Sequence, residues 1–211
     1  MLGKIIQKVD ISDLEKKLYK NGLLQVKPSS FYKKYTEEQL TYLAYMKGIY
    51  VFPTRELVNW LKKNAIGNMI EIGAGHGAIG RCLGIPTTDS KMQEMPEIKS
   101  YYSFMGQPVI EYPKDIEKLE AMEAVEKYKP NTVFGAYITH KWKTGLHDGN
   151  ILGVDEDELI KNVDMYISII NIKTHRNKPI LHYNHESLYF HWLITRSEQG
   201  DNRIVIWKKS K

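Results

Sequence analysis

The sequence contains a single cysteine, Cys82, among its 211 residues. One thiol cannot form an internal disulfide, and it excludes a zinc site built from several cysteines. No apolar run approaches the ~18 residues that a membrane-spanning helix needs, and the N-terminus M-L-G-K-I-I-Q-K lacks the charged-then-apolar layout of a signal peptide. We therefore expect a cytoplasmic protein with no membrane partner.

No residue type or charge sign dominates the composition. Hydrophobic residues make up 42% of the chain and charged residues 26%, which is ordinary for a globular protein with a sizeable core. The net charge of +5 and the isoelectric point near 9.0 permit an acidic partner such as nucleic acid without requiring one. With no internal repeat, the composition predicts one globular unit.

The most informative stretch is M-I-E-I-G-A-G-H-G-A-I-G-R-C-L, from Met69 to Leu83. Its first four residues predict a buried strand, and Gly73, Gly75 and Gly77 then give a turn in which positive φ is available and a ligand can approach the backbone. From Ala78 the pattern becomes helical, so free amide groups would face that ligand. This order of strand, glycine turn and helix is typical of nucleotide-like cofactor sites in α/β sheets.

A second acidic feature follows shortly after the turn. Gly84-Ile85-Pro86 ends the helix, residues 85–88 predict a brief strand, and Asp89 stands at its end. An acidic side chain in that place can accept hydrogen bonds from both ribose hydroxyls of a cofactor. The alternative is an ordinary turn aspartate.

The elements before the turn are expected to be helical. The segment S-S-F-Y-K-K-Y allows a basic aromatic contact for nucleic acid or a helix that packs its aromatic rings inward, and we favour the second. The predicted helices, each with a capping residue, cover residues 13–20 after Ser12, 37–46 after Thr36 and 55–66 after Thr54.

The elements after the turn alternate between strand and helix, with irregular chain expected over residues 91–108. A polar turn with Gly200 and Asp201 predicts that the last two strands form an antiparallel hairpin. The expected strands cover residues 109–112, 132–139, 165–172, 189–196 and 203–208, and the expected helices cover residues 115–129 and 155–162.

Taken together, these features resemble a class I S-adenosylmethionine-dependent methyltransferase. The resemblance rests on E-I-G-A-G-H-G, from Glu71 to Gly77, with Asp89 and the closing hairpin, and it covers about residues 60–211. It implies an α/β fold with a Rossmann-like, mostly parallel sheet and a C-terminal antiparallel hairpin. Residues 1–60 would be an N-terminal helical extension, and residues 61–211 the methyltransferase-like domain.

The resemblance also implies the cofactor, S-adenosylmethionine, and the residues that hold it. Asp89 would hold the ribose and Glu71 would orient the turn. No acid matches the family's adenine-flanking position cleanly; Glu111, Asp115 and Glu120 are candidates. The turn residues expected to approach the methionine part are Gly73, Ala74, Gly75 and Gly77.

The same turn also fits the dinucleotide pattern G-x-G-x-x-A through Gly73, Gly75 and Ala78, so a nicotinamide dehydrogenase is an alternative. Two features oppose it. Gly77 is an additional glycine, and the closing hairpin is antiparallel where a dinucleotide fold would continue in parallel units.

The sequence says less about the residues that would bind the methyl acceptor. Amino-directed DNA methyltransferases carry Asp or Asn, two prolines and an aromatic residue after the fourth strand, whereas this chain has G-A-Y-I-T-H-K-W. His140 is the expected acid/base residue, because imidazole titrates near neutral pH; the alternative is an ordinary loop histidine. The residues expected to shape the acceptor pocket are Tyr137, Thr139, Trp142, Asn171 and His175.

A histidine cluster near the C-terminus does not predict a metal site, because no helix places its members on one face. The cluster comprises His175, His182, His185 and His191, with Glu186. The sequence thus predicts a methyltransferase that acts on an unidentified acceptor, with nucleic acid possible. The alternative is a non-catalytic protein of the same fold that binds S-adenosylmethionine or a partner.

Overall fold

The computed structural model describes residues 7–145 and 147–209. The expectation that the chain has no signal peptide rests on residues 1–8, and most of these lie outside the described residues. No helix within the described residues has the length and apolar character needed to cross a membrane.

The centre of the molecule is a five-stranded mixed sheet in the order β3-β6-β7-β9-β8. Three neighbouring strands, β3 (Met69–Ile72), β6 (Thr132–Ala136) and β7 (Met165–Asn171), run parallel. The last strand in the chain, β9 (Asn202–Lys208), is antiparallel both to β7 and to β8 (His185–Leu188). The chain is therefore an α/β protein with a mixed sheet, not the mostly parallel sheet that was expected. The last two strands are antiparallel, but residues 189–196, expected as the first strand of the hairpin, do not form a strand.

A short parallel pair, β4 (Thr88–Asp89) and β5 (Glu117–Lys118), lies beside β3. An isolated parallel bridge joins Glu71 to Thr87. The amide of Glu71 donates to the carbonyl of Pro86 at 2.9 Å, and the amide of Ala74 donates to the carbonyl of Thr88 at 3.0 Å. These bonds place the end of β4 next to the turn that follows β3.

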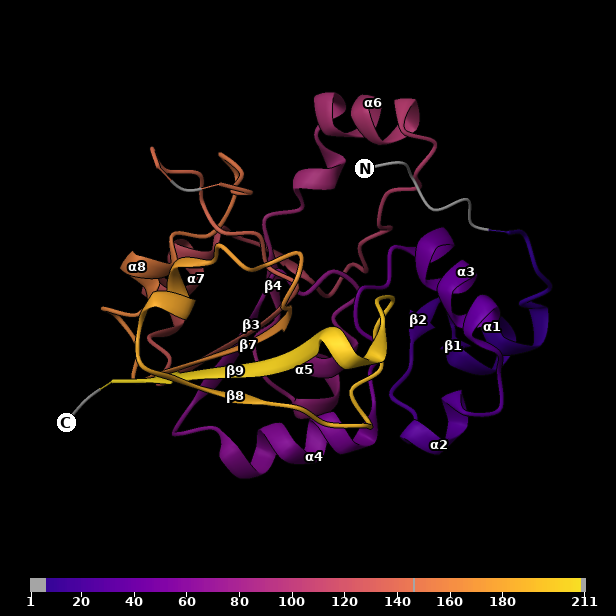
Figure 1. Ribbon diagram of the computed structural model, residues 1–211, viewed down its shortest axis with the longest axis horizontal. Coiled ribbons are helices and arrows are strands. Elements are labelled where there is room, and N and C mark those ends of the chain that lie inside the picture. Colours follow the sequence, from indigo (N-terminus) through magenta and orange to yellow (C-terminus); the bar gives the residue numbers. More distant parts are fainter. Residues whose placement is uncertain (1–6, 146, 210–211) are drawn as a thin grey trace.

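Helices cover both faces of the sheet (Figure 1). Strand β7 alternates accordingly, because Ile167 and Ile169 pack on one face and Tyr166 and Ile170 on the other. One face is covered by α4 (Arg55–Asn64) and α5 (Ala78–Leu83), and the other by α7 (Ala121–Tyr128) and α8 (Glu156–Leu159).

The N-terminal part forms its own hydrophobic cluster beside the sheet, around Leu14, Leu43 and Phe52. Tyr32 is buried within it while the neighbouring Lys33 is exposed, which confirms that this segment packs its aromatic rings inward. The elements are α1 (Ser12–Leu18), β1 (Tyr19–Lys20), β2 (Leu23–Leu24), α2 (Ser29–Tyr32) and α3 (Glu37–Lys47).

Helix boundaries in this part follow local capping chemistry. Thr36 and Gln39 form a capping box at the start of α3, and Gly48 ends that helix with a φ of 64°. The Thr54 hydroxyl accepts a hydrogen bond from the amide of Leu57 at the start of α4. The predicted starts of both helices are confirmed.

Two predictions between β4 and α7 are wrong. Residues 91–108 are not irregular: they contain the 3₁₀-helix η1 (Met92–Glu94) and α6 (Pro96–Phe104). Residues 109–112 are not a strand, because prolines flank them and the amide of Ile110 donates to the side chain of Gln93 at 2.9 Å instead of to a neighbouring strand.

Other elements differ in their bounds. The helix expected from residue 115 begins at Ala121, after β5, and the helix expected over 155–162 covers only Glu156–Leu159. The first hairpin strand lies earlier than predicted, at His185–Leu188, so the connection to β9 is long. Two further 3₁₀-helices, η2 (Pro179–His182) and η3 (Gln199–Asp201), lie in the C-terminal part.

Candidate functional site

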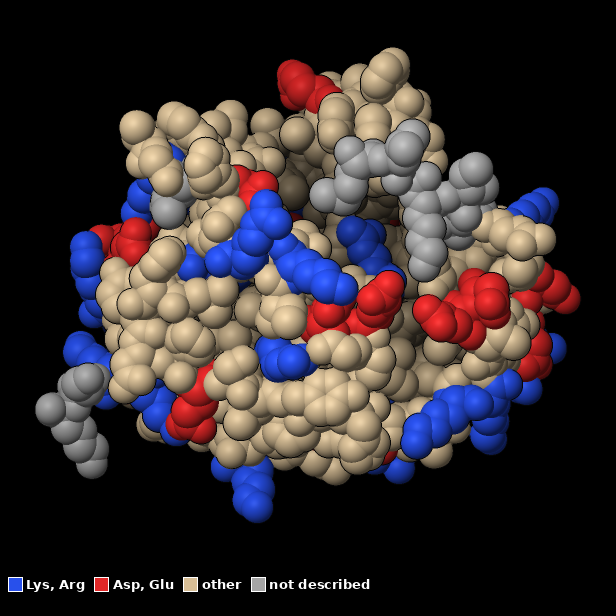
Figure 2. Space-filling model, in the orientation of Figure 1, with Lys and Arg blue, Asp and Glu red and all other residues tan. Residues whose placement is uncertain are grey.

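A cavity of about 400 Å³ lies at the carboxyl ends of β3, β4 and β6. The space-filling view shows the surface hollowed between α6 and the loop that contains Asn150 and Leu152, and Tyr102 of α6 and Leu152 both line the cavity (Figure 2). Other parts of the chain that line the cavity include the turn after β3, the segment from Gly48 to Val51, and Arg196 with Ser197.

The turn after β3 brings all of its predicted residues into the cavity lining. Gly73, Gly75 and Gly77 have φ angles of 56°, 54° and 60°, which L side chains adopt only with strain. A Cβ on Gly73 would lie 2.2 Å from Ile138, and one on Gly77 would lie 2.1 Å from Ile116. A side chain at either position would therefore displace an isoleucine side chain of the protein, in addition to the backbone strain.

Gly75 differs from its two neighbours. A Cβ built on it would have one neighbour within 4 Å, the Cδ1 atom of Ile110 at 3.4 Å, and Gly75 lines the cavity. At Gly75 the missing side chain leaves open space in the cavity, whereas at Gly73 and Gly77 the corresponding space is filled by protein side chains.

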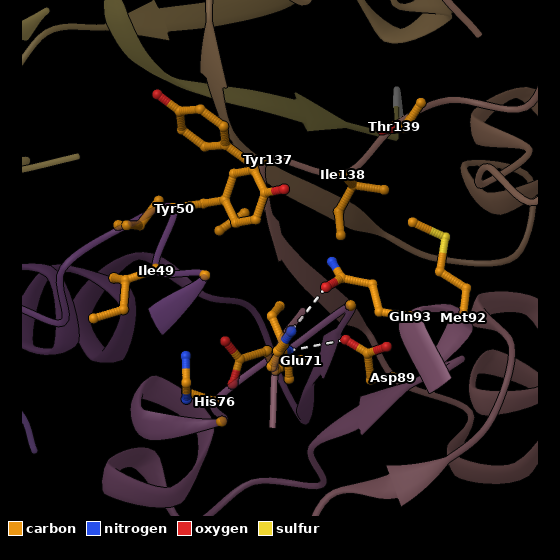
Figure 3. A pocket seen from close by; sticks show the side chains of 18 of the residues that line it. Ile49, Tyr50, Glu71, His76, Asp89, Met92, Gln93, Tyr137, Ile138 and Thr139 are labelled. Carbon is orange, nitrogen blue, oxygen red and sulfur yellow. Dashed lines mark hydrogen bonds between the residues drawn. The ribbon is translucent and has the colours of Figure 1, made fainter. Parts of the chain in front are cut away.

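Asp89 joins the turn to the end of β4 (Figure 3). One carboxylate oxygen accepts the amide of Gly75 at 2.9 Å, and the other accepts the amide of Lys91 at 2.7 Å. Each oxygen retains acceptor capacity for a ligand hydroxyl, since a carboxylate offers about four lone-pair sites. Burial raises the pKa of Asp89 above its ordinary value, against the effect of these two amide bonds.

Glu71 is buried between β3 and α5 and also reaches the cavity wall. Its carboxyl accepts the amide of Gly80 at 2.7 Å, and a Cβ on Gly80 would lie 2.5 Å from the same oxygen. Glu71 thus fixes the first turn of α5 against the strand. Burial raises the pKa of Glu71 to about 8, so this acid is largely uncharged at neutral pH.

The raised pKa of Glu71 predicts a pH dependence of stability. Because the folded pKa lies above the unfolded one, the contribution of Glu71 is fully present below about pH 4.5 and is lost as pH rises through about 8. Between these two pH values, the free energy of unfolding of the wild type should fall by up to about 1.4 kcal/mol per pH unit relative to that of Glu71→Gln. The glutamine keeps the acceptor oxygen but does not titrate. Urea unfolding of both proteins from pH 5 to 8 measures this difference; a constant difference would contradict it.

His76 connects the turn to the N-terminal part. Its Nε2 atom lies 2.6 Å from the carbonyl of Lys47, and since a carbonyl only accepts, Nε2 carries the proton. The ring meets Tyr19 edge-on at 6.2 Å, and burial lowers the pKa of His76. This contact brings Ile49 and Tyr50 to the rim of the cavity (Figure 3).

Tyr137 and His175 form the wall opposite the turn. Tyr137 follows β6 with a φ of 56°, a strained conformation for a non-glycine residue. Its hydroxyl lies 2.7 Å from Asn202 Oδ1 and 3.1 Å from Thr195 Oγ1. The Tyr137 and His175 rings meet edge-on at 5.2 Å.

The tautomer of His175 follows from one backbone contact. The amide of Asn171 donates to Nδ1 of His175 at 3.0 Å, so the proton of the neutral ring lies on Nε2. Burial lowers the pKa of His175 to about 4. The His175 ring is therefore neutral at neutral pH, and its Nδ1 is already occupied as an acceptor.

Of the other predicted acceptor-side residues, Thr139 lines the cavity, whereas His140, Trp142 and Asn171 do not. His140 is 2% exposed; its Nε2 donates to the carbonyl of His147 at 3.1 Å, and its ring packs on Gly149. Trp142 is exposed, and Asn171 lies behind His175. The structure thus places His140 where it supports the 147–153 loop.

The remaining candidates lie elsewhere. None of the three possible adenine-flanking acids lines the cavity, and Asp115 instead pairs with Arg81 at 2.6 Å. His182 and His191 are exposed, and Glu186 pairs with Lys208. Among residues 7–145 and 147–209, no group of three or more His, Cys, Asp or Glu side chains is arranged to hold a metal ion.

Sequence reasoning missed several residues of the cavity wall. They come from segments far apart in the chain: Tyr50, Gln93, Tyr102, Tyr112 and Arg196. Pro96 was an available signal for α6, because proline favours the first turn of a helix. Nothing local in the sequence marks Tyr50 or Arg196.

No protein-family model matches this chain, and no curated protein is significantly similar to it in sequence.

Proposed function

We propose that this protein is a methyltransferase of the class I, Rossmann-like kind, which binds S-adenosylmethionine at the turn after β3 and transfers its methyl group to an acceptor held near Tyr137. The observation that carries the proposal is the pairing of Gly75 with Asp89. A glycine with space at its Cβ position and a buried carboxylate with free acceptor capacity meet in one cavity.

The strand order supports this assignment. When the bridge between Glu71 and Thr87 is included, the strands run β5-β4-β3-β6-β7, followed by β9 and β8. If the five parallel strands β3 to β7 are numbered 1 to 5 along the chain, their order across the sheet is 3-2-1-4-5. This is the doubly wound order, in which ligands bind outside the carboxyl ends of the strands at the point where the strand order reverses. That switch point lies between β3 and β6, and the cavity lies there.

The residues present fit the cofactor. Asp89 would accept hydrogen bonds from the ribose hydroxyls, and Gly73, Ala74 and Gly75 would lie against the methionine part. Bound S-adenosylmethionine supplies a methyl group already activated by its sulfonium, so the protein needs mainly to orient the acceptor and exclude water. Glu71, largely uncharged at neutral pH, would keep the turn in place. We also propose that the protein is cytoplasmic.

Asp89→Asn should weaken S-adenosylhomocysteine binding by about tenfold, because a hydrogen bond to a carboxylate is roughly twice as strong as one to an amide. Calorimetric titration measures the change. Asp115→Asn is the matched control, since Asp115 lies near the same turn, pairs with Arg81 and does not line the cavity. Equal affinity of the Asp89 variant and the wild type would remove the ribose assignment.

A non-catalytic protein that binds the same cofactor is the second candidate, and the burial of His140 outside the cavity lining favours it. Incubation with a labelled methyl donor and host nucleic acid, protein and metabolite fractions separates the two. Label transfer supports the enzyme, whereas cofactor binding without transfer to any fraction supports the binding protein. A nicotinamide dehydrogenase fits less well, because β9 inserts antiparallel beside β7.

A further inference from the structure

Arg196 is the only lysine or arginine among the described residues that line the cavity. Its guanidinium stacks on the ring of Tyr50, with Cζ 3.6 Å from the ring centroid. Two backbone hydrogen bonds join the segments that carry Tyr50 and Arg196. The amide of Phe52 donates to the carbonyl of Ile194 at 2.9 Å, and the amide of Arg196 donates to the carbonyl of Tyr50 at 3.1 Å. The guanidinium is therefore placed by the fold at the cavity mouth.

No carboxylate neutralises this charge within the described part of the chain, where Arg196 makes no salt bridge at 4 Å or less. Its positive charge lowers the pKa values of Tyr102, Tyr137 and His175 as a secondary effect. An anion that entered this part of the cavity would meet an unpaired cation with a planar face.

The side chains packed around Arg196 are aromatic and line the cavity. Tyr50 and Tyr137 lie with their ring centroids 5.8 Å apart, on the side of the cavity across from Asp89 (Figure 3). Tyr102 of α6 adds a third aromatic side chain to the lining. Aromatic walls of this kind favour offset or edge-on contacts with another ring.

Among the described residues on the same side of the cavity, none is placed to act as a base. Nδ1 of His175 already accepts the amide of Asn171, and burial raises the pKa values of Tyr102 and Tyr137, so neither hydroxyl is deprotonated at neutral pH. The acceptor atom must therefore bring its own free electron pair. An oxyanion does so: its oxygen forms the new C–O bond, the pair of the broken S–C bond stays on sulfur, and no proton has to leave.

We propose that the methyl acceptor is an aromatic ring that carries a carboxylate or phosphate group, with the ring against Tyr50 and Tyr137 and the charge against Arg196. This inference rests on the proposed function. It assigns specificity for the acceptor to residues of the N-terminal segment and of the loop before β9, rather than to the loop that contains His140.

The test uses saturation-transfer NMR on the full chain with S-adenosylhomocysteine present. Benzoate and phenyl phosphate are the two probes and separate the carboxylate from the phosphate. Cyclohexanecarboxylate keeps the charge without the aromatic ring, and benzyl alcohol keeps the ring without the charge. We expect at least one of the two probes to bind at millimolar concentration and both controls to bind more weakly.

Arg196→Gln should weaken binding of the probe by up to about fivefold, the upper end of the range for a partly screened charge pair. Arg203→Gln is the matched control, because Arg203 also lies over a tyrosine ring, Tyr189, at 5.3 Å but does not line the cavity. Affinity for S-adenosylhomocysteine should stay unchanged in both variants, which shows that the cofactor half is intact.

The proposal is overturned if neither probe binds, if a control compound binds as well as its probe, or if Arg196→Gln binds the probe as the wild type does. Methylation of nucleic acid by a protein that binds neither probe also overturns it. Failure of S-adenosylhomocysteine to bind would instead count against the proposed function, and the same probe titrations without it would still test the aromatic anion site.

Discussion

Gly75→Val is expected to abolish binding of S-adenosylmethionine and S-adenosylhomocysteine, raising the dissociation constant at least about 100-fold, or about 2.7 kcal/mol. The φ of 54° disfavours a β-branched residue, and the nearest atom of the described residues outside the turn itself, Cδ1 of Ile110, lies 3.4 Å from a Cβ at this position. The valine side chain would therefore extend into the space assigned to the ligand. Calorimetric titration of the variant measures the loss.

Gly84→Val separates this effect from backbone strain. Gly84 ends α5 with a φ of 69°, and a Cβ there would have no atom within 4 Å. Both substitutions should lower stability by a similar amount, about 1–2 kcal/mol for a side chain at positive φ. Only the change at Gly75 should remove cofactor binding, so cofactor affinity retained in Gly75→Val would refute the placement of the ligand.

Lys178→Met is expected to destabilise the fold by about 3–5 kcal/mol, because it leaves a buried acid without its partner. Lys178 and Glu156 are both 0% exposed, and their charged atoms lie 2.6 Å apart. The ammonium also donates to the carbonyl of Ile138 at 2.7 Å, next to the strained Tyr137, and the Tyr166 hydroxyl donates to Glu156 at 3.1 Å. Urea unfolding measures the free-energy change.

The double variant Lys178→Met/Glu156→Gln tests the cause. Glutamine keeps an acceptor for Tyr166 but carries no charge, so much of the lost stability should return. Lys143→Met is the comparison at the surface, where a partly exposed lysine pairs with Asp155 at 2.7 Å, and it should cost at most about 1 kcal/mol. Equal losses for Lys178→Met and Lys143→Met would contradict the account of the buried pair.

The elements that the sequence predicts correctly are those set by local chemistry. The strand at Met69, the glycine turn and the short helix after it require glycine at particular backbone positions, and those glycines are visible in the sequence. The starts of α3 and α4 depend on threonine caps. By contrast, α6 was not predicted, although Ile98, Tyr101, Tyr102 and Met105 recur at helical spacing. The helix buries none of its residues, so this pattern does not mark a face packed in the core.

The two halves of the site differ in the same way. The proposed cofactor half comes from residues close together in sequence, between Glu71 and Asp89. The proposed acceptor half depends on a pairing between the segments around Tyr50 and Arg196, which are far apart in the chain. His140 was assigned by its position after a strand, but its side chain packs on Gly149 behind the cavity wall. Tertiary pairing, not local pattern, decides which side chains line this side of the cavity.

The most direct test of the account is calorimetric titration of the wild-type protein with S-adenosylhomocysteine, set beside the same titration with oxidised nicotinamide dinucleotide. The turn after β3 together with Asp89 predicts one binding site for S-adenosylhomocysteine, with a sub-millimolar dissociation constant, and no measurable heat from the dinucleotide. Absence of S-adenosylhomocysteine binding, or tighter binding of the dinucleotide, would contradict the assignment of this cavity to a sulfonium methyl donor.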